Sequence, residues 1–215
     1  MNVVVLTKTK KNYSNNKLPL FGISDHIFKT FDDRPNLLTK REVRVQILAD
    51  LELPKNGVIW DIGAGCGSIG LEALKLRPNL DLFCIDKRIG SKALIVENSK
   101  RLGVKPKFIF EEDINNILKI RNFKSFEKPN RSVIGGCDKE TKLKIIKKFA
   151  KDMRIGDIIV IPIINIQTIK ELKEELEDKN FKTTLNLIQT YKSLRIAKGM
   201  RLEPNNPIFI LKGKK

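Results

Sequence analysis

Two patterns of apolar and polar residues alternate along this chain. Short apolar runs, typical of buried strands, occur at 57–60, 80–85, 107–110, 131–134 and 157–164. Between them lie segments whose apolar residues stand three or four positions apart, as at Ile69, Ala73 and Leu76, which is typical of amphipathic helices. Because strands and helices alternate, the pattern predicts an α/β fold built on a mostly parallel sheet.

A further helix is predicted before the first strand. Thr39 and Glu42 have the spacing of a capping box, in which the Thr side chain caps the helix and the Glu side chain reaches back. The buried stripe of this helix would comprise Val43, Ile47 and Leu51. Pro54 cannot continue a helix, so we expect the helix to end before it.

The rest of the chain completes the predicted sheet. Helices are expected at about 90–102, where Gly103 closes the helix, and around 143–153 and 169–176. Two final strands, Phe181 to Thr190 and Pro207 to Leu211, would form an antiparallel hairpin joined by a basic loop, Tyr191 to Arg201. We therefore predict that 21–215 form a single domain, preceded by a flexible basic arm at 1–20.

The first strand leads into a glycine-rich turn, D-I-G-A-G-C-G-S, from Asp61 to Ser68. Glycines permit positive φ and let a ligand approach the backbone, while the following helix N-terminus offers unpaired N–H groups. A dinucleotide fingerprint, G-x-G-x-x-G, would need glycine where Ser68 stands, so that pattern fails. The spacing D-x-G-x-G-x-G instead resembles motif I of the S-adenosylmethionine (SAM) methyltransferases. The alternative is a plain glycine-rich connection.

Acidic residues follow the next two strands. Asp86 ends the second strand about 20 residues beyond the glycines, where an acid that binds ribose belongs. Its carboxylate could accept both ribose hydroxyls, and a solvated strand end is the alternative. The resemblance to a methyltransferase fold implies that an adenine lies beside the end of the third strand, where Asp113 could accept its exocyclic amine and Ile114 could pack on its ring. The alternative for Asp113 is a helix N-cap.

Composition narrows the class of protein. Hydrophobic residues make up 41% of the chain and charged residues 31%, as in folded globular proteins. The longest apolar run, Ile158 to Ile164, is far shorter than the ~20 residues that cross a membrane, so no membrane partner is expected. Three cysteines without a C-x-x-C pair suit a reducing cytoplasm. No metal is expected. The only histidine, His26, is interpreted as a surface or hydrogen-bonded residue, and contact of Asp25 and His26 with substrate is the alternative.

The formal net charge is +17, and in 179–215 Glu203 is the only acid. Nucleic acid is the obvious partner for such a surface. However, aromatic residues barely interleave with these charges, and a small polycarboxylate would be attracted equally well. The charge alone therefore does not identify the partner.

Four blocks of sequence carry a more specific signal. They are G-I-S-D-H-I-F at 22–28, L-T-K-R-E-V-R at 38–44, W-D-I-G-A-G-C-G-S at 60–68 and R-L-E-P-N-N-P-I-F-I at 201–210. Together they resemble the decarboxylating precorrin-6Y methyltransferases of cobalamin biosynthesis, which methylate carbon 15. Many methyltransferases share the third block, whereas the second and fourth are much more specific. The resemblance covers about 21–211.

The resemblance implies a Rossmann-like class I SAM-dependent methyltransferase fold, with SAM as methyl donor and a precorrin as substrate. The matching motif positions and their neighbours give the candidate cofactor-binding residues Thr39, Asp61, Gly63, Ala64, Gly65, Cys66, Gly67, Asp86, Asp113 and Ile114. Relatives suggest homo-oligomers. A separate protein that methylates carbon 5 is also expected, because the family's other catalytic domain is absent from this chain. Whether the precorrin carries cobalt stays open.

The substrate side departs from the family pattern. Cys137 and Asp138 follow Gly135 and Gly136, where the family has a longer glycine run. We expect these two glycines to face substrate. The basic loop residues Arg195, Lys198 and Arg201 are candidates to hold precorrin carboxylates, with a solvated loop as the alternative. No Ser/His/Asp or Cys/His constellation is evident, so no catalytic residue or general base is assigned.

Two other functions remain open at this level. An RNA methyltransferase is favoured by net charge alone. Enzymes that methylate exocyclic base amines present [D/N]-P-P-aromatic after the fourth strand, whereas this chain has Gly-Gly-Cys-Asp, and Cys137 lacks the preceding proline of base-carbon methylases. The second alternative is a SAM-binding protein without catalysis.

Overall fold

The computed structural model describes residues 18–35, 37–120 and 127–215. Most of the predicted arm, at 1–17, and part of the predicted polar loop 121–130 lie outside the described residues. The helices are α1 (Arg41–Asp50), α2 (Ser68–Leu76), α3 (Ser91–Leu102), α4 (Ile114–Ile117), α5 (Lys139–Ala150) and α6 (Ile169–Asp178). The strands are β1 (Gly57–Ile62), β2 (Leu80–Asp86), β3 (Phe108–Glu111), β4 (Arg131–Ile134), β5 (Ile158–Ile163), β6 (Lys182–Ile188), β7 (Tyr191–Ile196), β8 (Gly199–Pro204) and β9 (Ile208–Lys214).

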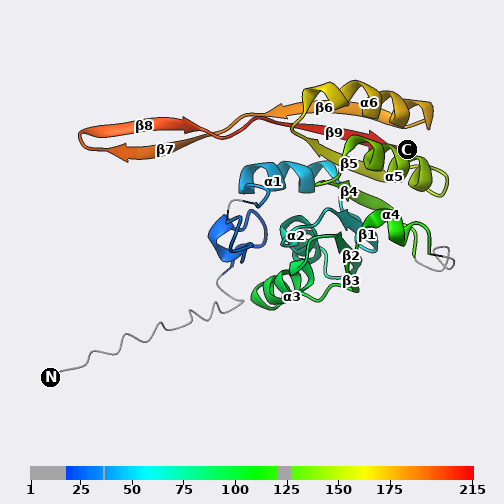
Figure 1. Cartoon of the computed structure of the whole chain (residues 1–215), viewed down its shortest axis with the longest axis horizontal. Coiled ribbons are helices and arrows are strands. Elements are labelled where there is room, and N and C mark those ends of the chain that lie inside the picture. Colours follow the sequence, from blue (N-terminus) through cyan, green and yellow to red (C-terminus); the bar gives the residue numbers. More distant parts are fainter. Residues whose placement is uncertain (1–17, 36, 121–126) are drawn as a thin grey trace.

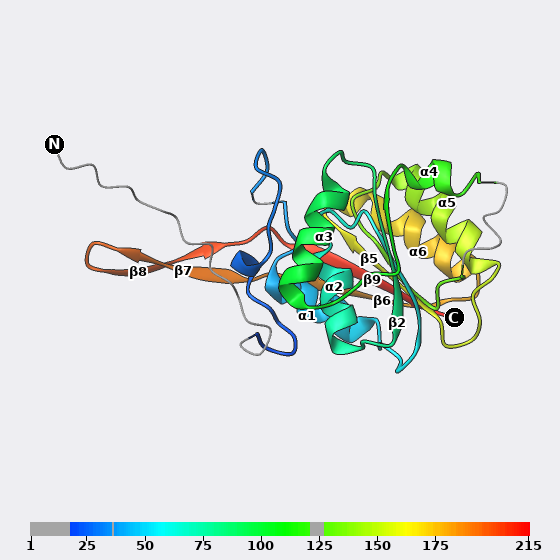
Figure 2. The same ribbon diagram turned by 90° about the horizontal axis from the view of Figure 1, so that it is seen from below.

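Seven strands form one sheet in the order β3-β2-β1-β4-β5-β9-β6. The pairs from β3 to β5 are parallel, and β9 lies antiparallel between β5 and β6. Helices α1, α2 and α3 cover one face of the sheet, and α4, α5 and α6 cover the other (Figures 1 and 2). The predicted mostly parallel sheet with a terminal antiparallel pair is confirmed.

The inner strands β1, β2, β4 and β5 are apolar because both faces of the sheet are covered there. Successive residues of a strand point to opposite faces, so Ile59 packs in the core beneath α1 to α3 while Trp60 packs beneath α4 to α6. The same alternation divides β5, where Val160 and Ile161 belong to different cores. Near-continuous burial of these strands explains why their sequence shows runs rather than alternation.

The direction of the sheet order reverses between β1 and β4. The chain moves from β1 outward to β2 and β3, and then returns to β4 on the other side of β1. Ile62 and Ile134, which end these two strands, are register partners, so the loops that follow them leave the same edge side by side. Ligands of open α/β sheets bind at such a reversal.

The predicted capping box of α1 is wrong. The helix has Lys40 as its N-cap and no side-chain capping bond, so Glu42 is its second rather than its third residue. The carbonyl of Thr39 instead accepts a hydrogen bond from Arg44. The predicted buried stripe is confirmed, since Val43, Ile47 and Leu51 are all buried.

The predicted basic loop is also wrong in structure, although the two flanking strands pair as expected. Tyr191 to Arg201 lie mostly in β7 and β8, which form a separate antiparallel ribbon with a turn at Ala197 and Lys198. The ribbon projects away from the sheet and its helices (Figures 1 and 2). Because β9 runs antiparallel to β5, the ribbon leaves from the edge at which the parallel strands end.

Candidate cofactor and substrate site

The glycine-rich turn after β1 forms a cradle at this reversal of the sheet. Gly63, Gly65 and Gly67 all have positive φ, between 58° and 79°. A Cβ on Gly63 would lie 2.4 Å from the carbonyl oxygen of Gly135, so only glycine lets the β1 and β4 loops approach so closely. A Cβ on Gly65 would meet nothing within 4 Å, so open space lies over the middle of the turn.

Asp86, at the end of β2, closes one side of this cradle. Its Oδ2 accepts the Gly65 N–H at 2.7 Å, and its Oδ1 accepts the Arg88 N–H at 2.8 Å. Each carboxylate oxygen has a second lone pair that remains available for a hydroxyl group. The acid predicted to bind ribose and the glycines predicted to approach a ligand are therefore brought together, and this arrangement fits the nucleoside part of SAM.

Asp61 serves the architecture of the turn. Its side chain is buried, and its Oδ2 accepts the Gly70 N–H in the first turn of α2 at 2.8 Å. Burial, and to a smaller degree the charge of Asp86, raises the pKa of the Asp61 carboxyl to about 7, although the bond from Gly70 lowers it. Its contact with α2 fixes the direction in which that helix leaves the cradle.

The other residues of the turn make mainly backbone contacts. The N–H groups of Gly63 and Ala64 both donate to the Ile85 carbonyl, which attaches the turn to the end of β2. Cys66 is buried, and burial raises the pKa of its thiol to about 11. Its carbonyl accepts a hydrogen bond from Asn98 at 2.9 Å. Cys66 therefore contributes a backbone group rather than a reactive thiolate.

Asp113 and Ile114 lie at the start of α4. Asp113 is the N-cap of this helix and accepts the Asn115 N–H at 2.8 Å, which confirms the helix-cap alternative. Its other oxygen lies 3.8 Å from the Lys87 amine. Ile114 packs in the core beneath α4 to α6. Contact of these two residues with an adenine stays a prediction.

The loop after β4 combines glycine with two partly buried reactive groups. A Cβ on Gly136, which also has positive φ, would lie 3.3 Å from the Gly63 Cα. Burial raises the pKa of the Cys137 thiol to about 11, so the thiol is protonated near neutral pH. Burial lowers the pKa of the nearby Lys142 amine. The predicted substrate glycines thus lie directly beside the cofactor cradle.

The ribbon does not gather its basic residues on one face. Directly paired residues of two antiparallel strands share a face, and successive residues alternate. Arg195 pairs with Met200, whereas Arg201 pairs with Leu194, so the two arginines project to opposite faces. Lys198 lies in the turn. The three residues therefore do not form a single grip within one copy of the chain.

A buried ion network that the sequence analysis missed anchors the segment before α1. Arg44 and Glu72 have no exposed side-chain surface, and the Arg44 Nε donates to Glu72 Oε2 at 3.1 Å. Glu72 also accepts the N–H groups of Gly22 and Ile23. Arg44 further donates to Asp25 Oδ1 at 2.8 Å. This network joins two of the four sequence blocks, at 22–28 and 38–44, to helix α2, which begins at the end of the third block.

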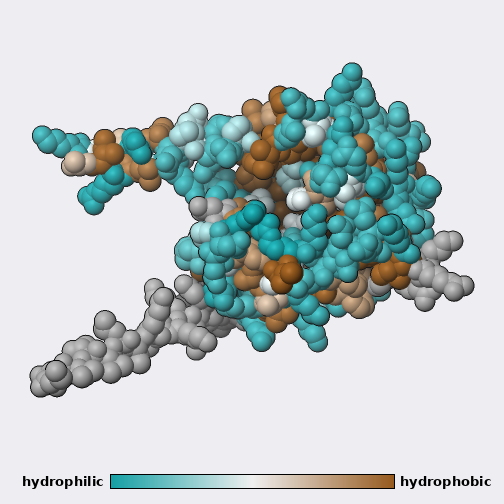
Figure 3. Space-filling view, viewed as in Figure 1, coloured by the Kyte–Doolittle hydropathy of each residue, from teal (hydrophilic) through white to brown (hydrophobic). Residues whose placement is uncertain are grey.

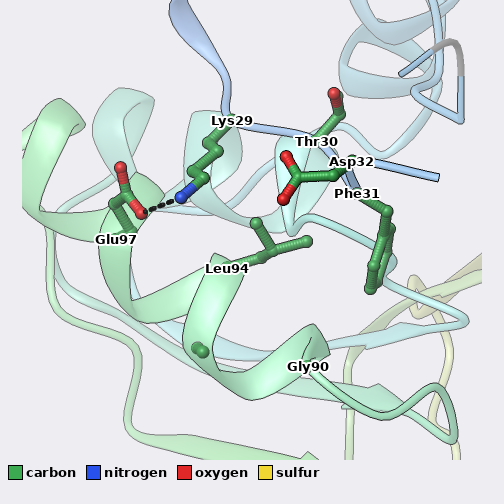
Figure 4. A pocket seen from close by; sticks show the side chains of 8 residues that line it. Lys29, Thr30, Phe31, Asp32, Gly90, Leu94 and Glu97 are labelled. Carbon is green, nitrogen blue, oxygen red and sulfur yellow. Dashed lines mark ion pairs between the residues drawn. The ribbon is translucent and has the colours of Figure 1, made fainter. Parts of the chain in front are cut away.

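The segment also borders a hollow of about 220 Å³ against α3 (Figure 4). Its lining residues are Lys29, Thr30, Phe31, Asp32, Gly90, Ala93, Leu94 and Glu97. The Lys29 amine and the Glu97 carboxylate face each other at 3.2 Å. None of these residues belongs to the predicted cofactor set. His26 is exposed, as expected.

Other classes of site receive no support from the described parts of the chain. Within residues 18–35, 37–120 and 127–215, no three His, Cys, Asp or Glu side chains are grouped to hold a metal ion. Over the same ranges, the helices are too short or too polar to span a membrane. All three cysteines are free thiols.

Comparisons with known proteins agree with this geometry. A probable cobalt-precorrin-6B C(15)-methyltransferase (decarboxylating) of Saccharolobus solfataricus is 32% identical over 207 residues, which cover 90% of this chain and 96% of that protein. The crystal structure of a precorrin-6Y C5,15-methyltransferase from Geobacter metallireducens matches with a TM-score of 0.79 and 27% identity, over 93% of this chain and all of that one.

A SAM-dependent O-methyltransferase from Thermotoga maritima has a TM-score of 0.62 at 16% identity, over 82% of this chain and 66% of that one. That likeness shows the fold, which is the class I SAM-dependent methyltransferase fold. The family model of the precorrin methyltransferase domain matches residues 30–215. The chain therefore belongs to the precorrin methyltransferase family.

Proposed function

We propose that this protein transfers the methyl group of SAM to carbon 15 of a precorrin and removes a carboxyl group from a ring acetate. The cradle of Gly63 and Gly65, closed by Asp86 at the reversal of the sheet, is the observation that carries the cofactor side of the proposal. Membership of the precorrin methyltransferase family, and the names of similar proteins, support the substrate and the reaction.

Bound SAM supplies an electrophilic methyl group on a sulfonium. The chain's task is to hold the acceptor carbon in line with it, and such positioning contributes up to ~7–11 kcal/mol in favourable reactions. In this proposal Asp86 receives the ribose hydroxyls, and Thr39 contacts the cofactor as the family resemblance implies. The loop of Gly135 and Gly136, which lies against Gly63, is proposed to border the precorrin beside the cradle. Cys137 is assigned no nucleophilic role, because burial raises the pKa of its thiol to about 11.

Basic side chains supply the recognition of a polycarboxylate. Arginine binds carboxylates through two parallel hydrogen bonds. Arg195 and Arg201 project from opposite faces of the ribbon, so we propose that they reach carboxylates of different substrates, or of one substrate held between two copies. Lys198, at the tip of the ribbon, adds positive charge that attracts the substrate.

Three further parts belong to the same proposal. We expect the protein to form homo-oligomers and to act with a separate protein that methylates carbon 5. A cytoplasmic location is supported by the three free thiols, since unpaired cysteines are typical of reducing compartments.

The deciding experiment incubates the protein and SAM with precorrin intermediates and analyses the products by mass spectrometry. We expect the tetrapyrrole to gain one methyl group and to lose one carbon dioxide. Bulk RNA serves as a parallel substrate, because the net charge of +17 favours RNA as the alternative. Methylated RNA with unchanged precorrin would contradict the proposal. SAM binding without turnover of any tetrapyrrole would favour a protein that binds SAM without catalysis.

Asp86→Ala tests the cofactor side separately. Loss of a charged hydrogen-bond partner should raise the dissociation constant of SAM by about tenfold to a hundredfold, which corresponds to ~1.5–3 kcal/mol. Calorimetric titration measures this directly. Asp81→Asn is the matched control, because Asp81 lies at the other end of the same strand and pairs with Lys107. Equal affinities in the two variants would remove Asp86 from the site.

A further inference from the structure

Asn98 connects two parts of the molecule that the sheet leaves unconnected. It lies on α3 with no exposed surface. Its Oδ1 accepts the Lys29 N–H at 2.7 Å, and its Nδ2 donates at 2.9 Å both to the Lys29 carbonyl and to the Cys66 carbonyl. One buried amide therefore satisfies both backbone groups of Lys29 and one backbone group of the glycine-rich turn.

The first of these parts is residues 22–31, which we call the N-terminal strap. Apart from a bridge between Phe31 and Arg34, the described strap residues pair with no strand. Buried side chains of the helices bind its backbone instead. Glu72 of α2 accepts two N–H groups at one end, and Asn98 of α3 binds Lys29 near the other. Beyond the strap, the Thr39 carbonyl accepts a hydrogen bond from Arg44 of α1.

The second part is the cofactor cradle. Cys66 lies between two glycines of the turn. The Gly65 N–H donates to Asp86, and Gly67, which has a positive φ, is the N-cap of α2. These residues are contiguous, so a shift of the Cys66 carbonyl turns the neighbouring peptide groups as well. Glycine permits many backbone conformations, and a turn that contains three glycines needs external contacts to hold one of them. The Asn98 amide is such a contact.

We propose that Asn98 is a positioning residue for the cofactor site, which holds the glycine-rich turn in its binding conformation and couples it to the N-terminal strap. This inference rests on the proposed binding of SAM. A residue with this role acts through Cys66 and need not touch the cofactor itself. The coupling is reciprocal, so a ligand that orders the turn also stabilises the attachment of the strap.

The test compares Asn98→Ala with Ser99→Ala. Ser99 is the next residue of α3, is also buried, and donates only within its own helix, to the Val96 carbonyl at 2.8 Å. We expect Asn98→Ala to raise the dissociation constant of SAM about tenfold or more in calorimetric titrations, while Ser99→Ala changes it less than about twofold. In turnover assays the KM for SAM should rise with little change in kcat, because saturating SAM restores the turn.

A merely structural Asn98 would lower the melting temperature of the variant but leave the SAM affinity of the folded protein unchanged, and that result would overturn the inference. If Asn98→Ala does not fold, hydrogen exchange of the wild-type protein decides instead. SAM should slow exchange of the Lys29 amide, and an unchanged rate would be equally decisive against the coupling. If the wild-type protein binds no SAM, the proposed function fails. If the wild-type protein and Asn98→Ala bind SAM equally well, only the role of Asn98 fails.

Discussion

At the scale of single residues, the buried acid Asp61 makes the fold sensitive to pH. Its carboxyl has an ordinary pKa of 3.8 when exposed and a pKa of about 7 in the folded protein, chiefly because of burial. Below about pH 4 the Asp61 carboxyl is protonated in both the folded and the unfolded protein, so its burial does not destabilise the fold through a buried charge. As the pH rises to about 7, the unfolded state releases its proton first, so the folded state loses stability.

We therefore predict that Asp61→Asn removes this pH dependence. The free energy of unfolding of the wild-type protein, minus that of the variant, should fall between about pH 4 and about pH 7, by at most ~4 kcal/mol. Urea unfolding of both proteins across this range measures the difference. Taking the difference cancels the contributions of other groups, such as Glu52, whose pKa is lowered to about 2 by Lys212 and Lys214. A difference that does not vary with pH would show that Asp61 is ionised throughout.

Some residues of the site were accessible from sequence and others were not. Asp86 was found because an acid at a strand end, at a fixed distance from a glycine turn, has a place set by the topology. Glu72 and Asn98 lie inside helices, where nothing in the local pattern distinguishes a buried polar side chain from an exposed one. Their partners, Gly22 and Lys29, are far away in the chain, so only tertiary structure reveals the contacts.

At the scale of elements, the Arg44–Glu72 pair attaches α1, α2 and the N-terminal strap to one another. Both side chains are fully buried, and each has further backbone partners. Removing one member of such a pair leaves the other charge buried with less compensation. The attachment of the strap thus depends on both charges being present.

Glu72→Gln should accordingly destabilise the protein by about 3 kcal/mol, since breaking a buried ion pair costs ~3–5 kcal/mol and Asp25 still compensates part of the Arg44 charge. The control is Glu42→Gln, an exposed acid in the first turn of α1, for which we expect a change within ~0.5 kcal/mol. Chemical denaturation monitored by the single tryptophan measures both. Similar stabilities of the two variants would show that the network is not important for the fold.

Elements with a strong hydrophobic pattern are predictable from the sequence, and elements with a weak pattern are not. Strands β1, β2, β4 and β5 are buried on both faces, so their apolar runs identify them directly. β7 and β8 carry charged and apolar residues on both faces, and their turn, Ala197 and Lys198, lacks the Asn-Gly or Asp-Gly signal of a hairpin. The sequence pattern therefore predicts a loop where the structure has the ribbon. The start of α1 was misplaced because the Thr39 carbonyl, rather than its side chain, is engaged.

At the scale of the whole molecule, the ribbon is the feature that a single copy does not explain. An isolated two-stranded hairpin is marginally stable in water. One face of the ribbon nevertheless presents Tyr191, Leu202 and Met200, whose exposed fractions are 58%, 69% and 75%. Figure 3 shows hydrophobic side chains among hydrophilic ones along this projection. A second copy that covers this face would stabilise the ribbon and account for the exposed apolar surface.

We predict that the double substitution Met200→Lys and Leu202→Lys shifts the protein from oligomer toward monomer. Sedimentation velocity at micromolar concentrations measures the distribution. Lys192→Gln, on the opposite face of the ribbon, is the control and should leave the oligomer intact. SAM affinity should be retained in all variants, since the cofactor cradle lies at the ends of β1 and β2.

Salt separates this interface from binding to nucleic acid. The net charge of +17 makes copies of the chain repel one another, so added salt should strengthen an apolar association by screening that repulsion. Binding to RNA through lysines and arginines would weaken steeply instead, because salt opposes counterion release. A wild-type protein that stays monomeric at all salt concentrations would contradict the proposed interface. A complex with RNA that dissociates as the salt concentration rises would show that the basic residues of the ribbon bind nucleic acid.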